Sequence, residues 1–247
     1  MLAIGDAVRR VPSITSQDAL VEELAHPRRP TLLAFVNAHA CNLAVSDPQL
    51  ERDLVGADVV LRDGSGMVLL YRAQGLDAGL NMNGTDFIPM LIRAFEDQSI
   101  ALLGTRDPWL SAAAEGIADT SRVVLVRDGF LDDDQYVRDV RDAGPALVIL
   151  GMGMPRQERV GTRLRAELDH PCLIVCGGAI LDFMGGKVQR APAGLRRLGL
   201  EWIWRLVIEP RRLFRRYVVG NAVFVVRLCG VWCERRFRSA SHPGASP

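Results

Sequence analysis

Short apolar runs alternate with longer segments of mixed polarity along most of the chain, and this alternation limits the possible folds more than any other feature. Apolar runs of this length are typical of strands buried on both faces of a parallel sheet. The segments between them have the length and spacing of helices. The sequence therefore predicts an α/β fold: a doubly wound, Rossmann-like domain with a mostly parallel sheet. The predicted strands are 31–36, 59–61, 100–103, 122–126, 146–150 and 172–175, and the predicted helices are 16–25, 84–96, 107–118, 132–142 and 155–167.

The C-terminal part of the chain differs in charge from the rest. The 247 residues carry a net charge of +1, but residues 201–238 hold nine Arg against three Glu, which leaves −5 for the remainder. We therefore divide the chain into an α/β domain, residues 1–198, and a basic helical appendage, residues 199–247. The appendage favours an anionic partner, which could be a lipid headgroup, a nucleic-acid backbone or a substrate phosphate.

The apolar stretches of the appendage are shorter than the roughly 20 residues of a spanning helix. On a helix, Arg205, Arg212 and Arg216 would share one face beside an apolar one, as in a helix that lies on a membrane surface. Pro210 is predicted to divide the segment into two helices. The alternative is an ordinary terminal helix that docks on the domain with a solvated arginine face.

Cysteine usage and the first residues indicate an intracellular chain. The number of cysteines is odd and their spacing forms no disulfide or zinc framework, so we expect reduced thiols. The N-terminal residues lack the apolar core and cleavage site of a secretory signal, and we expect a cytoplasmic protein. The five cysteines are Cys41, Cys172, Cys176, Cys229 and Cys233, of which the second and third bracket a predicted strand and are expected in the core.

The segment RDGSG follows the second predicted strand and places Asp63 at a strand end before a flexible turn. A carboxylate in such a position is suited to act as a general base. The alternative is that Asp63 caps the next helix or forms a turn.

A glycine-rich segment, GMGMPRQE, follows the fifth predicted strand. Gly151 and Gly153 let the backbone approach a ligand, the free N–H groups of the following helix could receive a phosphate, and the Gln157 amide could bind a sugar. Arg156 stands where a dinucleotide fingerprint needs its third glycine, which disfavours a nicotinamide cofactor. A tight turn without a ligand is the alternative.

Two patterns that could suggest metal binding have simpler explanations. Residues 132–134 are three consecutive Asp before a helical pattern, and we interpret them as a helix cap rather than a D-x-D metal motif. His39 and Cys41 have no further ligand nearby in sequence, so they do not indicate a metal site.

Asp182 lies in a glycine-rich segment after the sixth predicted strand, followed by Lys187, the only lysine of the chain, and Arg190. The acid could accept hydrogen bonds from a nucleobase or ribose, and the cations could bind a phosphate. A structured loop with a surface salt bridge is the alternative.

Taken together, these segments resemble the WecG/TagA/CpsF family of bacterial glycosyltransferases in both their order and their amino-acid sequence. The resemblance extends from about residue 30 to about residue 225. It rests on VNAHACNLAVSDPQL, RDGSG, NGTD, LLGT, GMGMPRQE, GGAILDFMGGKVQRAP and GLEWIWRLVIEPRRLFRRY. The PRQE and RAP blocks, combined with EW-x-x-R-x-x-x-E-P-x-R, are the most specific of these.

The resemblance implies an inverting transfer of a sugar from a UDP-sugar to a polyprenyl-pyrophosphate-linked acceptor, in the synthesis of cell-surface polysaccharides such as exopolysaccharides. The sugar would be N-acetylmannosamine, its uronic acid or glucose. The family further implies a peripheral protein on the cytoplasmic face of the membrane that needs no metal and forms a possible homodimer. No nucleic-acid partner is expected.

The same resemblance assigns roles to individual residues. Asp63 matches the proposed catalytic base, and Arg205, Arg212 and Arg215 match arginines thought to stabilise the diphosphate. The matching substrate-binding positions are Asn37, Gly64, Gly104, Gly151, Gln157, Glu158, Asp182 and Arg190.

The sequence departs from the family pattern at two positions. Phe35 replaces a threonine, which removes a hydroxyl group from the donor pocket, and Asn81 replaces an arginine, which removes a cation that could hold a phosphate. Two rival functions remain open. One is a nucleotide-binding oxidoreductase on the same fold, and the other is a non-catalytic nucleotide-binding module with a basic tail that binds membranes or nucleic acid.

Overall fold

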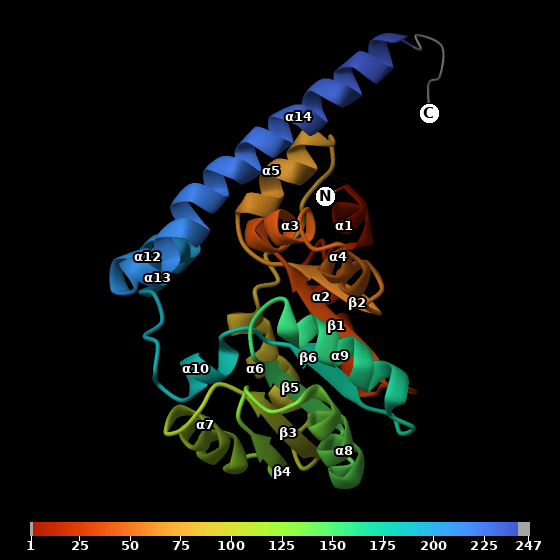
Figure 1. Ribbon diagram of the computed structural model, residues 1–247, viewed down its shortest axis with the longest axis vertical. Coiled ribbons are helices and arrows are strands. Elements are labelled where there is room, and N and C mark those ends of the chain that lie inside the picture. Colours follow the sequence, from red (N-terminus) through yellow and green to blue (C-terminus); the bar gives the residue numbers. More distant parts are fainter. Residues whose placement is uncertain (1, 242–247) are drawn as a thin grey trace.

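A computed structural model describes residues 2–241 as an α/β domain with a helical appendage (Figure 1). Within this range the side chains of residues 2, 193, 197, 231 and 233–241 lie outside the description, and Cys233 is one of them. Cys41, Cys172 and Cys176 are free and buried, and Cys229 is free and exposed, so the predicted core positions of Cys172 and Cys176 are confirmed.

One six-stranded, wholly parallel sheet forms the centre of the domain, in the order β2-β1-β6-β5-β3-β4. Nearly all residues of β1, β2, β5 and β6 are buried, as the apolar runs predict. Each strand end lies within one residue of its predicted position. The strands are β1 Thr31–Val36, β2 Val59–Arg62, β3 Ser99–Gly104, β4 Arg122–Arg127, β5 Leu147–Gly151 and β6 Leu173–Cys176.

Helices cover both faces of the sheet, which confirms the doubly wound architecture (Figure 1). Side chains of α2, α6 and α7 form one hydrophobic cluster with the sheet, and those of α8 and α9 form another on the opposite face. The ends of these five helices lie within two residues of the predicted ones. They are α2 Ile14–Ala25, α6 Gly84–Ala94, α7 Trp109–Ala118, α8 Asp133–Ala143 and α9 Arg156–Glu167.

Among the described residues, six shorter helices lie outside the predicted helix ranges. Four of them carry the side chains of a third cluster, which packs beside β1 and β2. Their short length gives too few turns for a helical period to show in the sequence. They are α1 Leu2–Ala7, α3 Ala38–Ala44, α4 Pro48–Val55, α5 Gly66–Ala73, α10 Ile180–Met184 and α11 Ala193–Arg197.

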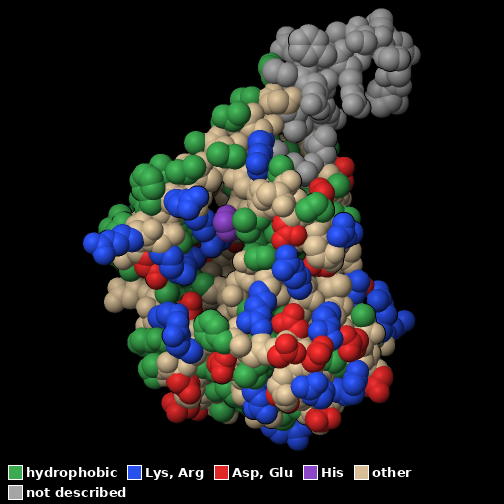
Figure 2. All heavy atoms as spheres, viewed as in Figure 1, with side chains coloured by type: hydrophobic (Ala, Val, Ile, Leu, Met, Phe, Trp, Pro, Cys, Tyr) green, Lys and Arg blue, Asp and Glu red, His purple; other side chains and the backbone are tan. Residues whose placement is uncertain are grey.

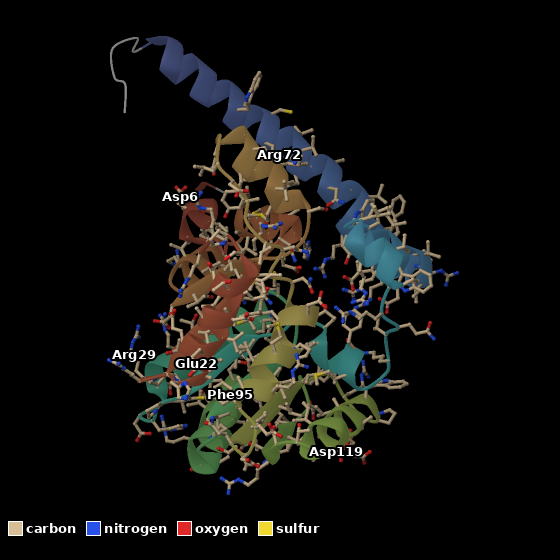
Figure 3. All side chains as sticks on the ribbon, turned by 180° about the vertical axis from the view of Figure 1, so that it is seen from behind. Asp6, Glu22, Arg29, Arg72, Phe95 and Asp119 are labelled. Carbon is tan, nitrogen blue, oxygen red and sulfur yellow. The ribbon has the colours of Figure 1, made fainter. Side chains whose placement is uncertain are left out.

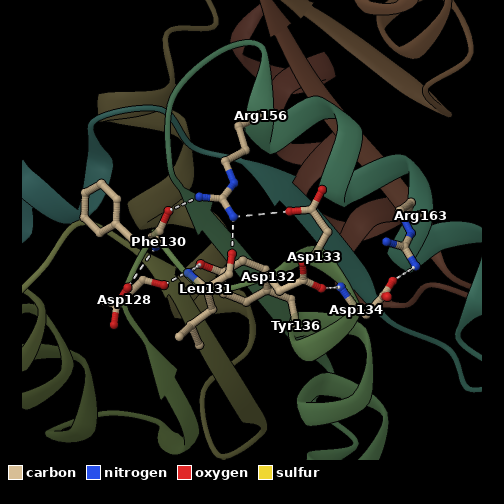
Figure 4. Close-up of polar contacts among 10 residues, drawn as sticks. Asp128, Phe130, Leu131, Asp132, Asp133, Asp134, Tyr136, Arg156 and Arg163 are labelled. Carbon is tan, nitrogen blue, oxygen red and sulfur yellow. Dashed lines mark hydrogen bonds and ion pairs between the residues drawn. The ribbon is translucent and has the colours of Figure 1, made fainter.

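The three consecutive aspartates 132–134 begin α8, as predicted (Figure 4). The Asp132 carboxylate accepts a hydrogen bond from the Asp134 backbone N–H at 2.9 Å, which satisfies a free donor of the first turn. Asp133 instead faces Arg156 at 3.3 Å, and Asp134 faces Arg163 at 2.6 Å. Each carboxylate therefore has its own partner.

The appendage comprises α12 Glu201–Ile208, α13 Pro210–Phe214, a π-helical turn η1 at Arg215–Val219, and α14 Gly220–Ser241. Pro210 begins α13 and separates it from α12, as predicted. Within the described part of the chain, no helix is both long and apolar enough to cross a membrane.

The first part of α14 returns to the domain and lies along α5 in opposite views (Figures 1 and 3). Its Phe224 and Leu228 are buried in the cluster that contains α3 and α5. Asn42 of α3 adds polar contacts: its side-chain N–H donates to the Gly220 carbonyl at 2.7 Å, and its side-chain oxygen accepts from Arg227 at 2.9 Å. The appendage is thus anchored on α3.

The carboxyl ends of β3 and β5 approach closely through two facing glycines, and we predict that Gly104→Ala destabilises the fold. A Cβ atom on Gly104 would lie 2.4 Å from the carbonyl carbon of Gly151, and the φ of +152° is itself unfavourable for a side chain. Because both neighbours are backbone, we expect a loss of about 3 kcal/mol or more in urea unfolding.

Gly116→Ala is the matched control. Gly116 lies in α7 with open space around its Cβ position, so this change should leave the stability unchanged or raise it by up to about 1 kcal/mol. Equal effects of the two substitutions would contradict the close-approach argument.

Candidate active site

A cavity of about 260 Å³ lies at the carboxyl ends of the strands, where ligands bind in sheets of this type. The segments after β1, β2, β5 and β6 form its floor and walls, together with the start of α6, and the appendage covers it. Figure 2 shows the hollow beneath the appendage, with basic side chains and a histidine at its edge. Its polar lining includes Asn37, His39, Asp63, Thr85, Gln157, Asp182, Arg205, Arg212 and Arg216.

Asp63 follows β2 and is held by the neighbouring strand end. Its backbone N–H donates to the Val36 carbonyl at 2.8 Å, and its carboxylate accepts from the Asn37 side chain at 3.2 Å. Asn37 also caps α3 by accepting from the Ala40 N–H at 3.0 Å. Asp63 caps no helix, because α5 begins at Gly66 with Ser65 as its N-cap. The carboxylate therefore faces the cavity.

The environment of Asp63 raises the pKa of its carboxyl group. Burial is the largest cause, and it is opposed by the Asn37 hydrogen bond and by the charges of Arg216, Arg205 and Arg62. A carboxylate with a raised pKa beside a cavity is a typical proton acceptor in catalysis.

Two residues that do not line the cavity shape the loop of Asp63. Arg62 is 5% exposed and its guanidinium donates to three carbonyl oxygens, including that of Gly64 at 3.0 Å. The Asn81 side-chain oxygen accepts from the Gly64 N–H at 2.7 Å. Asn81 therefore positions the loop from outside the cavity, and Gly64 adopts the positive φ of +83° that this turn requires.

Three arginines of the appendage line the cavity: Arg205, Arg212 and Arg216. The Nε atoms of Arg205 and Arg216 are buried and donate to no acceptor among the described residues. Arg205 stacks over the Phe183 ring, with Cζ 5.2 Å from its centroid. Burial and the nearby Arg205 and Arg212 lower the pKa of Arg216, while Tyr217 and Asp63 oppose this effect. The cavity therefore presents free cationic donors, which suits an anionic ligand.

Arg215, which the family resemblance indicates, is exposed and is not among the lining residues. Arg216 takes its place in the cavity. The helical spacing of Arg205, Arg212 and Arg216 already predicts a shared face, so periodicity identifies the lining residue that the alignment of motifs misses.

Gln157 joins the loops that follow β5 and β6. Its side-chain oxygen accepts from the Gly153 N–H at 3.2 Å and the Gly178 N–H at 2.9 Å, and its amide N–H donates to Glu158 at 2.8 Å. Glu158 is 1% exposed and lies outside the cavity, and burial raises its pKa to about 7. The pair thus fixes two backbone segments of the cavity wall.

The remaining predicted positions divide between the cavity and its surroundings. Asp182 lines the cavity and accepts from Thr105 and, at 2.9 Å, from Lys187. Gly151 also lines the cavity, whereas Gly104 supports it from behind through the close approach described above. Arg190 is paired with Asp86 outside the cavity.

Arg156, which replaces the third glycine of a dinucleotide fingerprint, has a structural task (Figure 4). Its guanidinium donates to the carbonyl oxygens of Gly129, at 2.6 Å, and Leu131, and lies over the Tyr136 ring. It thereby ties the loop after β4 to the start of α9. Among the side chains that the structure describes, no three His, Cys, Asp or Glu are grouped so that they could hold a metal ion.

Comparison with known proteins shows the family. A family profile described as the glycosyl transferase WecG/TagA/CpsF family matches residues 8–239. The chain belongs to this family of glycosyltransferases. The match covers both the α/β domain and the arginines of the appendage, so the cavity between them is the candidate active site of a glycosyltransferase.

Two curated relatives have the same name, N-acetylglucosaminyldiphosphoundecaprenol N-acetyl-beta-D-mannosaminyltransferase. The protein of Bacillus subtilis strain 168 is 24% identical over 232 residues, which is 90% of each chain. That of Bacillus spizizenii is 27% identical over 194 residues, 74% of this chain and 73% of the relative.

We predict different effects on anion binding when each of the two neighbouring arginines of η1 is replaced. Arg216→Ala should weaken the binding of inorganic pyrophosphate by roughly tenfold to a hundredfold, because it removes charge-assisted hydrogen bonds from a half-buried position in the cavity. Arg215→Ala, the matched control, should change the affinity by less than about threefold because surface charges are well screened. Isothermal titration calorimetry measures both, and a larger effect of Arg215→Ala would contradict the assignment.

Proposed function

We propose that this glycosyltransferase moves a hexose from a UDP-sugar to a polyprenyl-diphosphate-linked acceptor. The observation that carries the proposal is a carboxylate with a raised pKa in a cavity that three arginines line. Arg205 and Arg216 each have a buried Nε atom without an acceptor among the described residues, whereas Arg212 is paired with Glu209. A diphosphate matches the charge and the hydrogen-bonding capacity of these arginines. The names of both relatives supply the acceptor class.

In the proposed reaction, Asp63 accepts the proton of the acceptor hydroxyl as the oxygen attacks the anomeric carbon of the donor. The attack comes from the face opposite the diphosphate, so the configuration inverts. Asn37 donates a hydrogen bond to the Asp63 carboxylate and thereby holds it in the orientation that faces the cavity. General-base assistance of this kind contributes roughly 10²–10⁴ in rate.

The arginines act on the leaving group. Negative charge grows on the UDP diphosphate as the glycosidic bond breaks, and fixed guanidinium donors stabilise that charge more in the transition state than in the ground state. We infer that Arg205, Arg212 and Arg216 take the part that a divalent cation has in many other sugar transferases. Asp182, which also lines the cavity, would accept hydrogen bonds from the nucleoside.

We propose N-acetylmannosamine as the donor sugar, because both named relatives transfer it. Its uronic acid and glucose are the alternatives. The predicted homodimer stays a prediction.

The appendage also supports a peripheral position on the cytoplasmic face of the membrane. Its helices expose many apolar side chains next to arginines, the arrangement of an interfacial helix on anionic lipid. The acceptor lipid would then reach the cavity from the membrane side. The exposed apolar residues are Ile203, Val207, Ile208, Phe214, Val218, Val219, Val223, Val225 and Val226.

The function is tested by a panel of UDP-sugars, with GDP-sugars and NAD as controls, assayed for binding and turnover with wild type and Asp63→Asn. We expect UDP-sugar turnover that rises with pH as the Asp63 carboxyl ionises, and a loss of roughly 10²–10⁴ in the variant with little change in nucleotide affinity. Unchanged turnover in Asp63→Asn would show that Asp63 is not the catalytic base. Binding of NAD without any response to uridine nucleotides would favour the oxidoreductase.

Membrane association is tested by sedimentation with vesicles that contain phosphatidylglycerol. The double variant Val207→Asp, Val226→Asp should lose vesicle binding, because both side chains are at least 70% exposed and would place charge against lipid. Ile14→Asp, equally exposed at the start of α2, is the control and should bind like wild type. Retained binding by the double variant would assign the membrane contact to another surface.

A further inference from the structure

His39 lines the candidate active site but has no role in the reaction described so far. It is the second residue of α3 and lies two positions after Asn37, which contacts Asp63. The imidazole is half-buried, and neither ring nitrogen makes a hydrogen bond to a described residue. A hydrogen-bonding group is therefore available inside the cavity, at the wall beneath the arginines.

The charged groups that face this part of the cavity come from every element around it. Arg205 lies on α12, Arg212 on α13 and Arg216 on η1, while Asp63 follows β2 and Asp182 lies on α10. Burial and, secondarily, the charge of Arg216 lower the pKa of His39 to about 4. The imidazole is therefore neutral at pH 7 in the free protein, and the three arginines are the cations of this wall.

A bound diphosphate reverses the electrostatic balance at His39. Its negative charges offset those of the arginines, and an anion within about 6 Å favours the charged form of an imidazole. The pKa of His39 must then rise toward neutrality. Once protonated, both ring nitrogens are donors, and the one that faces the ligand can donate to a phosphate oxygen.

We propose that His39 is a ligand of the donor diphosphate and takes up one proton from solvent when the nucleotide binds. The proposal rests on the proposed function, since it takes the nucleotide diphosphate as the anion. Protonation of His39 adds a fourth cation only when the phosphates are present. The free cavity therefore holds no further positive charge beside the arginines. The proton returns to solvent when the product nucleotide leaves.

This coupling makes donor affinity depend on pH with a definite sign. The pKa of His39 is higher in the complex than in the free protein, so binding is strengthened below the bound-state pKa. Affinity falls as the pH rises through that value, by up to about tenfold per pH unit between the two pKa values. A side chain that cannot ionise removes this dependence.

The direct test is NMR titration of the histidine ring nitrogens with and without UDP-N-acetylmannosamine. A UDP-sugar is preferred to UDP because its diphosphate lacks the terminal ionisation of a phosphate monoester, near pH 6. His39→Gln identifies the His39 signal among the four histidines. We expect titration near pH 4 in the free protein and above about pH 6.2 in the complex, because a lower bound-state pKa would change the affinity less than about fivefold between pH 5.5 and 7.5. An unchanged titration curve would overturn the proposal.

Affinity measurements separate the contribution of His39 from that of Asp63, whose carboxyl group also lines the cavity. Wild type should bind the UDP-sugar at least about fivefold more tightly at pH 5.5 than at pH 7.5, whereas His39→Gln should vary less than about twofold. Asp63→Asn should keep the wild-type dependence. His26→Gln, an exposed histidine after α2, is the matched control and should behave as wild type.

The outcomes distinguish this proposal from the proposed function. If wild type binds the UDP-sugar but His39→Gln keeps the full pH dependence, His39 is not the proton acceptor and the UDP-sugar assignment stands. If no UDP-sugar binds at any pH, both proposals fail together.

Discussion

Positive charges that share a cavity repel one another, and the candidate site holds three guanidinium groups beside the half-buried carboxylate of Asp63. Asp63 attracts Arg205 and Arg216, and Glu209 pairs with Arg212, but these attractions offset only part of the repulsion, so the arrangement depends on contacts elsewhere. Burial of Phe224 and Leu228 against α3 and α5 provides them, at about 1.5–3 kcal/mol for each side chain. The hydrogen bonds of Asn42 fix the position of α14. Hydrophobic docking of one helix thus holds the charges of another in place.

The sheet and its long helices were predictable because their signals are local. Buried parallel strands are continuous apolar runs, and α8 begins where its capping aspartates stand. The ranges of the short helices α3 and α5 were not predicted, because one or two helical turns are too short to show a hydrophobic period. They begin after Asn37 and Ser65, and their positions depend on packing against β1 and α14.

The site was partly predictable for a related reason. Asp63, Asn37 and Gln157 stand directly after strands, and the topology brings such positions together. The choice between Arg215 and Arg216 depends on the rotation of one helical turn over the cavity, and the contribution of His39 depends on which wall of the cavity α3 forms. Neither property is encoded in a motif, although helical spacing does indicate Arg216.

Helix α3 contacts both the candidate base and the appendage. Its cap, Asn37, holds the candidate base, and its Asn42 holds the appendage. A tilt of α14 would therefore act on the residue that orients the carboxylate, with only one and a half helical turns between the two contacts. Exchange of appendages between relatives, to change the acceptor or the membrane, should accordingly treat α3 and the appendage as one module. A graft that divides them would separate the cover of the cavity from its floor.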